Sequence, residues 1–154
     1  MREPREYPEQ ADGPTIVDVD LGAFLRQAAD PIEEYAEEVA LLLVNRVLAF
    51  YGKPENTELA AMTDALLTHC ANLATGVETI PERQRPTRGQ GALRDWAQLQ
   101  QDGPGDGPLG SWSYARQLAL VARNMVTALR ENRTAGRQPF VGRSEAPPLA
   151  PSAP

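Results

Sequence analysis

Closely spaced glutamates are the first residues whose type and spacing could do chemistry. Two pairs stand four residues apart and share a helix face: Glu33, Glu34, Glu37 and Glu38. Dimetal helical bundles combine such carboxylates with Glu-x-x-His motifs. The lone histidine is His69, and Leu66 stands three residues before it. We therefore expect no metal and no other cofactor. We interpret the glutamates as a solvated face in the first turns of a helix, where the macrodipole favours negative charge.

The adjacent pair His69 and Cys70 is the second candidate for chemistry, as a thiol–imidazole dyad. Neighbouring side chains of a helix point about 100° apart, so these two do not face each other. Cys70 lies instead on an apolar face, where a small buried thiol is the common case. No second histidine is present to act as a base for any serine. We expect no catalytic residue and a non-enzymatic protein.

The glycine- and proline-rich segment 102–110 precedes a helix, as phosphate-binding loops do. It lacks the G-x-x-x-x-G-K-[ST] pattern, contains no lysine, and carries the carboxylates of Asp102 and Asp106, which repel phosphate. We interpret it as a connector.

Aromatic and arginine side chains around this segment give the remaining candidate site. Arg116, Arg123 and Arg130 recur every seven residues, and Arg94 precedes the loop. Guanidinium groups bind carboxylates and phosphates bidentately. The aromatics Trp96, Trp112 and Tyr114 either fix the loop to the body or line a pocket beside Arg116. The candidate ligand- or partner-binding residues are Trp112, Tyr114, Arg116, Arg123, Arg94 and Trp96.

Composition excludes several classes of protein. The chain has 154 residues and a formal net charge of -6, which makes nucleic acid an improbable partner. No apolar run is long enough to cross a membrane, and the N-terminus has no apolar signal segment. One cysteine excludes an internal disulfide, and together with the missing signal it predicts a cytoplasmic location.

Apolar spacing predicts an all-α bundle of three long and one or two short helices. We expect a flexible arm over residues 1–15, a helical domain over 16–133, and a disordered Pro/Ala-rich tail over 134–154. The expected helices span 18–29, 31–51, 57–79, 91–101 and 111–132. Pro31 is expected to open the second of these, because proline suits the first turn of a helix. The short helices are expected to cap the ends of the bundle.

Part of the chain resembles a known group of sequences. The segments are Ala92-Leu93-Arg94-Asp95-Trp96 and Gly103-Pro104-Gly105-Asp106-Gly107-Pro108-Leu109-Gly110-Ser111-Trp112, continuing to Ala115-Arg116. They resemble small helical actinobacterial proteins that are labelled natural-product-biosynthesis proteins from their gene context. The resemblance covers about residues 90–130. It implies a helical, cytoplasmic protein and supplies no catalytic residues.

These observations favour a helical accessory or regulatory protein that acts by binding another protein or itself. Apolar helix faces that stay partly uncovered are what such contacts use. Two alternatives remain open. One is a small-molecule binder or tailoring enzyme with a pocket of Trp112, Tyr114 and Arg116. The other is an acidic antagonist that uses the glutamate face as a decoy.

Overall fold

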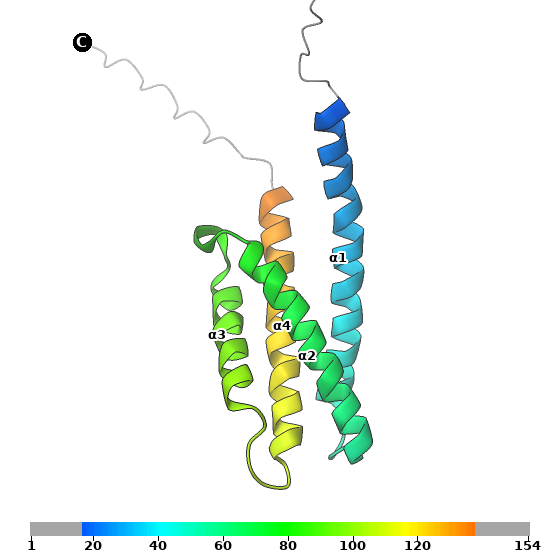
Figure 1. Cartoon of the computed structure of the whole chain (residues 1–154), viewed down its shortest axis with the longest axis vertical. Coiled ribbons are helices and arrows are strands. Elements are labelled where there is room, and N and C mark those ends of the chain that lie inside the picture. Colours follow the sequence, from blue (N-terminus) through cyan, green and yellow to red (C-terminus); the bar gives the residue numbers. More distant parts are fainter. Residues whose placement is uncertain (1–16, 138–154) are drawn as a thin grey trace, which may run out of the picture. The chain divides into compact units, whose positions relative to one another are not determined.

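The computed structural model describes residues 17–137, which form four α-helices and one 3-10 helix (Figure 1). The helices are α1 (Val17–Ala49), α2 (Asn56–Thr79), η1 (Glu82–Gln84), α3 (Thr87–Asp102) and α4 (Gly110–Arg137). No strand occurs in residues 17–137. The prediction of an all-α fold is confirmed. In the described part of the chain, none of the helices combines the length and the apolarity that a membrane crossing requires.

The chain divides into two compact units, the first ending at Glu38 and the second beginning at Val39. The division falls inside α1, so the first unit contributes the N-terminal part of that helix. The expected arm (1–15) and most of the expected tail lie outside the described residues. Residues 134–137 of that tail belong to α4.

The expected break at Pro31 is wrong, because α1 is one helix of 33 residues with Pro31 inside it. Proline has no N–H to donate to the carbonyl of Gln27, four residues earlier. Gln27 and its neighbours Ala28 and Ala29 are exposed, so water reaches that carbonyl. The missing hydrogen bond therefore costs less free energy here than in a buried helix, and the helix continues through Pro31.

The second unit is organised around α4, which packs against both α2 and α3 (Figure 1). Because α4 has neighbours on two sides, its buried residues cover more than one stripe. They are Trp112, Tyr114, Ala115, Leu118, Ala119, Val121, Ala122, Met125, Val126 and Ala128. The alanines leave room for neighbouring helices to approach. The C-terminal part of α1 adds Ala40, Val44 and Val47 to the same core.

Helix α2 buries the stripe that its spacing predicts. Leu59, Met62, Leu66, Cys70, Leu73 and Val77 are all buried. Its last turn is closed by Arg85, whose Nη2 donates to the carbonyls of Glu78 at 3.2 Å and Ile80 at 3.1 Å. Carbonyls at a helix end have no partner within the helix, so this guanidinium supplies one.

Helix α3 is longer than the expected 91–101 and packs along α4 instead of capping the bundle end. Its first turns approach two helices closely at Gly89. A methyl group there would lie 3.1 Å from Cβ of Ala128 and 3.2 Å from Cγ1 of Val77. A side chain at this position would require Ala128 and Val77 to move by a few tenths of an ångström.

The α2 register predicts that Leu66→Asp destabilises the protein severely. Leu66 is fully buried, so the substitution places an unpaired carboxylate in the core and removes apolar contacts. We expect the free energy of unfolding to fall by about 4 kcal/mol or more. Urea titration followed by circular dichroism measures it. The matched control is Ala71→Asp at an exposed position of α2. Equal stabilities for the two variants would contradict the register.

Candidate functional site

The predicted site residues Trp112 and Arg116 lie together where α4 begins, but they hold the end of α1. The Trp112 and Phe50 rings meet edge to face, with centroids 5.9 Å apart and an interplanar angle of 71°. The guanidinium carbon of Arg116 lies 5.6 Å from the Trp112 ring centroid. Its Nη1 donates to the carbonyl oxygen of Leu48 at 3.5 Å. Leu48 is in the last turn of α1, so Arg116 partners a carbonyl that the helix leaves open.

Tyr114, the third predicted residue of this group, is buried beside Cys70. Burial raises the pKa of the Tyr114 phenol, and charge on Cys70 would raise it further. Burial also raises the pKa of the Cys70 thiol from 9.0 to about 12. The thiol lies 3.4 Å from the Leu118 carbonyl oxygen and donates to it. Cys70 is therefore a protonated core residue at neutral pH, as the sequence predicts.

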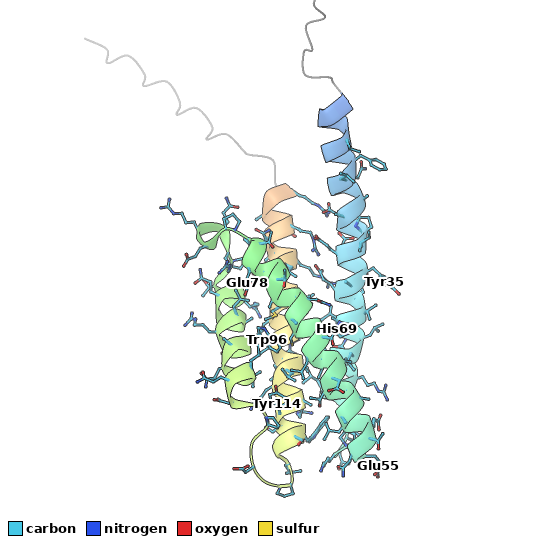
Figure 2. All side chains as sticks on the ribbon, in the orientation of Figure 1. Tyr35, Glu55, His69, Glu78, Trp96 and Tyr114 are labelled. Carbon is cyan, nitrogen blue, oxygen red and sulfur yellow. The ribbon has the colours of Figure 1, made fainter. Side chains whose placement is uncertain are left out.

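The other predicted residues do not join this group. Trp96 is buried in the core from α3, and Figure 2 labels it and Tyr114 on neighbouring helices. Arg94 on α3 and Arg123 on α4 are exposed. The three aromatics thus belong to the core, and in the described part of the chain only Arg116 among the predicted arginines has a recorded contact with one of them.

The glutamate face differs from the expected one in two ways. The four residues lie deep inside α1 and far from its first turn, so the macrodipole argument does not apply to them. Glu37 is 2% exposed and Glu34 is half-buried, whereas Glu33 and Glu38 are exposed. The expectation that all four glutamates form a solvated face is therefore wrong. Among the residues that the structure describes, no three or more His, Cys, Asp and Glu side chains gather as a metal site.

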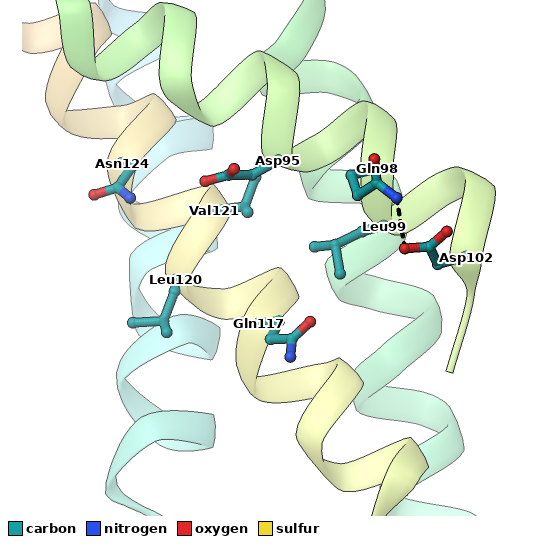
Figure 3. A pocket seen from close by; sticks show the side chains of 8 residues that line it. All are labelled: Asp95, Gln98, Leu99, Asp102, Gln117, Leu120, Val121 and Asn124. Carbon is teal, nitrogen blue, oxygen red and sulfur yellow. Dashed lines mark hydrogen bonds between the residues drawn. The ribbon is translucent and has the colours of Figure 1, made fainter. Parts of the chain in front are cut away.

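A groove of about 320 Å³ lies between α3 and α4 (Figure 3). Each helix contributes four residues at positions i, i+3, i+4 and i+7. They are Asp95, Gln98, Leu99 and Asp102 from α3, and Gln117, Leu120, Val121 and Asn124 from α4. Gln98 Nε2 donates to Asp102 Oδ2 at 2.6 Å. The lining carries carboxylates and amides but no arginine, so it does not suit the anionic ligand that Arg116 was expected to hold.

An adjoining hollow is lined by the 103–110 loop, Leu99, Asp102, Ser113, Gln117 and Tyr114, without Trp112 or Arg116. The loop's conformation depends on its glycines. Gly103 has φ +62°, and a methyl group on Gly110 would overlap the carbonyl of Gly105. The only lysine of the chain, Lys53, donates its Nζ to the Pro108 carbonyl oxygen at 3.2 Å. These contacts hold the loop in place, and its role as a connector stays a prediction.

The first unit exposes an apolar face that the sequence reasoning did not recognise as continuous. Leu21, Leu25, Ala28, Ile32 and Tyr35 form what we call the α1 stripe. Its four large side chains are between 53% and 71% exposed, and Ala28 is exposed as well. Tyr35 is labelled in Figure 2. The apolar spacing of this stripe continues across Pro31 in the sequence. The helix break that we expected at Pro31 divided the stripe between two helices.

Comparison with known proteins places most of the second unit in a family. Residues 38–134 match the family of unknown function DUF6415, and the chain belongs to that family. The match begins next to Val39, where the second unit begins, so the α1 stripe lies outside it. No curated protein and no solved structure matches the chain. The actinobacterial natural-product link stays a prediction.

The contacts of Arg116 predict a structural role that stability measurements reveal. Arg116→Ala removes the hydrogen bond to Leu48 and the contact with Trp112. We expect a loss of about 1–3 kcal/mol in the free energy of unfolding. Arg123→Ala, at an exposed position of the same helix, should change it by less than about 0.5 kcal/mol. Urea titration compares the two variants, and an Arg116→Ala protein as stable as the control would contradict this role.

The raised pKa of Cys70 predicts a stability that falls in alkaline solution. The folded state keeps the thiol proton up to about pH 12, whereas the unfolded thiol loses it near pH 9.0. The unfolded state therefore binds fewer protons above pH 9, and its formation becomes more favourable as pH rises. Relative to Cys70→Ala, the wild type should lose stability steadily from pH 9 to 11. Chemical denaturation at each pH measures the free energy of unfolding of both proteins. If the two free energies changed with pH in the same way, the raised pKa of Cys70 would be disproved.

Proposed function

We propose that the protein is a non-enzymatic helical accessory protein that works by binding a protein partner through the α1 stripe. The exposed stripe is the single observation that carries this proposal. Large apolar patches on a protein surface mark interaction sites, because exposing them to water is unfavourable. The cytoplasm is the proposed location, consistent with a single buried thiol.

The length of α1 supports a role for its N-terminal part in binding. A single helix in water is marginal unless an apolar face is packed, because nucleation costs more than propagation returns. Residues 40–47 of α1 pack into the core of the second unit. The α1 stripe, by contrast, keeps its large side chains exposed. A partner that covers the stripe would provide the missing packing.

The burial of the aromatic candidates argues against the alternative of a small-molecule pocket formed by Trp112, Tyr114 and Arg116. Trp112 and Tyr114 offer little free surface, and Arg116 is engaged with Leu48 and Trp112. A link to natural-product biosynthesis would then be that of an accessory protein and not of a tailoring enzyme.

The proposal predicts a binding activity that depends on the α1 stripe. The immobilised full chain, incubated with lysate of its source organism, should retain a discrete protein or further copies of itself. The double variant Ile32→Gln, Tyr35→Gln should retain at least about tenfold less, because it removes two central apolar contacts but keeps good helix formers. Quantitative mass spectrometry of the eluates measures the difference.

Glu33→Gln is the matched control, because it lies on the same helix, is exposed, and is outside the stripe. It should bind like the wild type. Circular dichroism establishes that all three proteins keep their helices. Equal retention by the double variant, or no retention by the wild type, would refute the proposal.

A further inference from the structure

The spacing of the α1 stripe is that of a coiled coil. Leu21, Leu25, Ala28, Ile32 and Tyr35 follow one another at steps of 4, 3, 4 and 3 residues. This alternation defines heptad positions a and d, the two positions that meet a partner helix in a coiled coil. Leu25 and Ile32 occupy a, and Leu21, Ala28 and Tyr35 occupy d.

Charged residues avoid this face. In residues 21–38 the charged side chains are Arg26, Asp30, Glu33, Glu34, Glu37 and Glu38. All but Glu38 fall at the outer positions b, c and f. Within residues 21–38 a second helix placed on the stripe therefore meets no charge at any a or d position, and burial of the stripe strands no ionised group.

We propose that α1 pairs through this stripe with α1 of a second copy of the chain, as a parallel two-stranded coiled coil. This inference rests on the proposed function and names the partner. A β-branched residue at a, here Ile32, together with leucine at d, here Leu21, favours two parallel strands. In that arrangement each stripe packs against an identical stripe, which is the self-complementary contact of a two-fold dimer.

The flanking positions fit a parallel partner as well. Position e is held by small residues throughout, namely Gly22, Ala29 and Ala36. In a parallel pair, position g of one helix lies beside position e of the next heptad of the other. Phe24, which is 65% exposed at position g, then lies over Ala29 of the partner subunit. The large ring of Phe24 then fills the space that the small side chain of Ala29 leaves beside the a and d positions.

The exposed area of the first unit is comparable with what a biological interface buries. Leu21, Phe24, Leu25, Ile32 and Tyr35 are all more than half exposed. Side chains of this size offer on the order of 100 Å² each for burial. The sum is about 500 Å² from each copy and about 1,000 Å² for the pair, which matches the roughly 1,000 Å² that a biological interface needs.

Sedimentation velocity of the purified full chain tests the partner. Over about 1–200 μM the wild type and Glu33→Gln should sediment as a dimer at the upper concentrations. The double variant Ile32→Gln, Tyr35→Gln should stay monomeric, with a dissociation constant raised at least tenfold. A wild type that is monomeric at every concentration would overturn the inference, and so would a dimer that the double variant keeps.

Disulfide trapping tests the direction of the pair. In a Cys70→Ala background, Leu21→Cys places a thiol at a d position near the end of the stripe. Two parallel helices bring these cysteines together, and mild oxidation should give a covalent dimer. An antiparallel pair centred on Ala28 separates them by about 21 Å along the axis, beyond the reach of a disulfide. Gln27→Cys, exposed at position c, is the control and should stay uncrosslinked. A stripe-dependent dimer in which Leu21→Cys does not crosslink would overturn the parallel arrangement.

The outcomes also separate this inference from the proposed function. A purified chain that stays monomeric, while the immobilised chain still retains another protein in a stripe-dependent manner, would reject the second copy and keep protein binding. A monomer that also retains nothing would reject both.

Discussion

Helix α1 carries two apolar faces, and the fold of the second unit uses one of them. Ala40, Val44 and Val47 are buried in the core of that unit, whereas the α1 stripe points elsewhere on the helix and is exposed. A helix cannot present both faces to the same neighbour, because positions on different faces diverge by the 100° turn per residue. The need to cover the second face is the constraint from which the proposed association follows.

The second unit has a core of its own, which is centred on α4. Helix α4 lies between α2 and α3 and buries side chains toward both. At its start, Trp112 contacts Phe50 and Arg116 donates to the carbonyl of Leu48 in the last turn of α1, while Lys53 donates to the carbonyl of Pro108. Trp112 and Arg116, which the sequence suggested as binding residues, thus make contacts that stabilise the second unit. Aromatic and arginine side chains serve both purposes, so their types alone could not decide between them.

Periodicity predicted the all-α class, the span of α2 and nearly all of its buried face, because the large apolar residues there recur at helical spacing on the side that faces the core. The prediction of a helix break at Pro31 failed, because the helix continues through this proline. Pro31 is a sound signal for a helix start, yet its missing hydrogen bond falls at an exposed carbonyl and costs little. The burial of Glu37 could not be foreseen either, since it depends on which face of α1 turns inward. The exposed α1 stripe could have been read from the heptad spacing once residues 21–35 were treated as one helix.

Backbone hydrogen exchange across residues 21–36 of the purified full chain tests the central claim most directly. If a partner helix covers the α1 stripe, these amides should exchange slowly at high protein concentration, with protection approaching that of α2 around Leu66. Exchange as fast as that of an unstructured peptide, at the highest concentration attainable, would show that the stripe is not packed by association and would contradict the account.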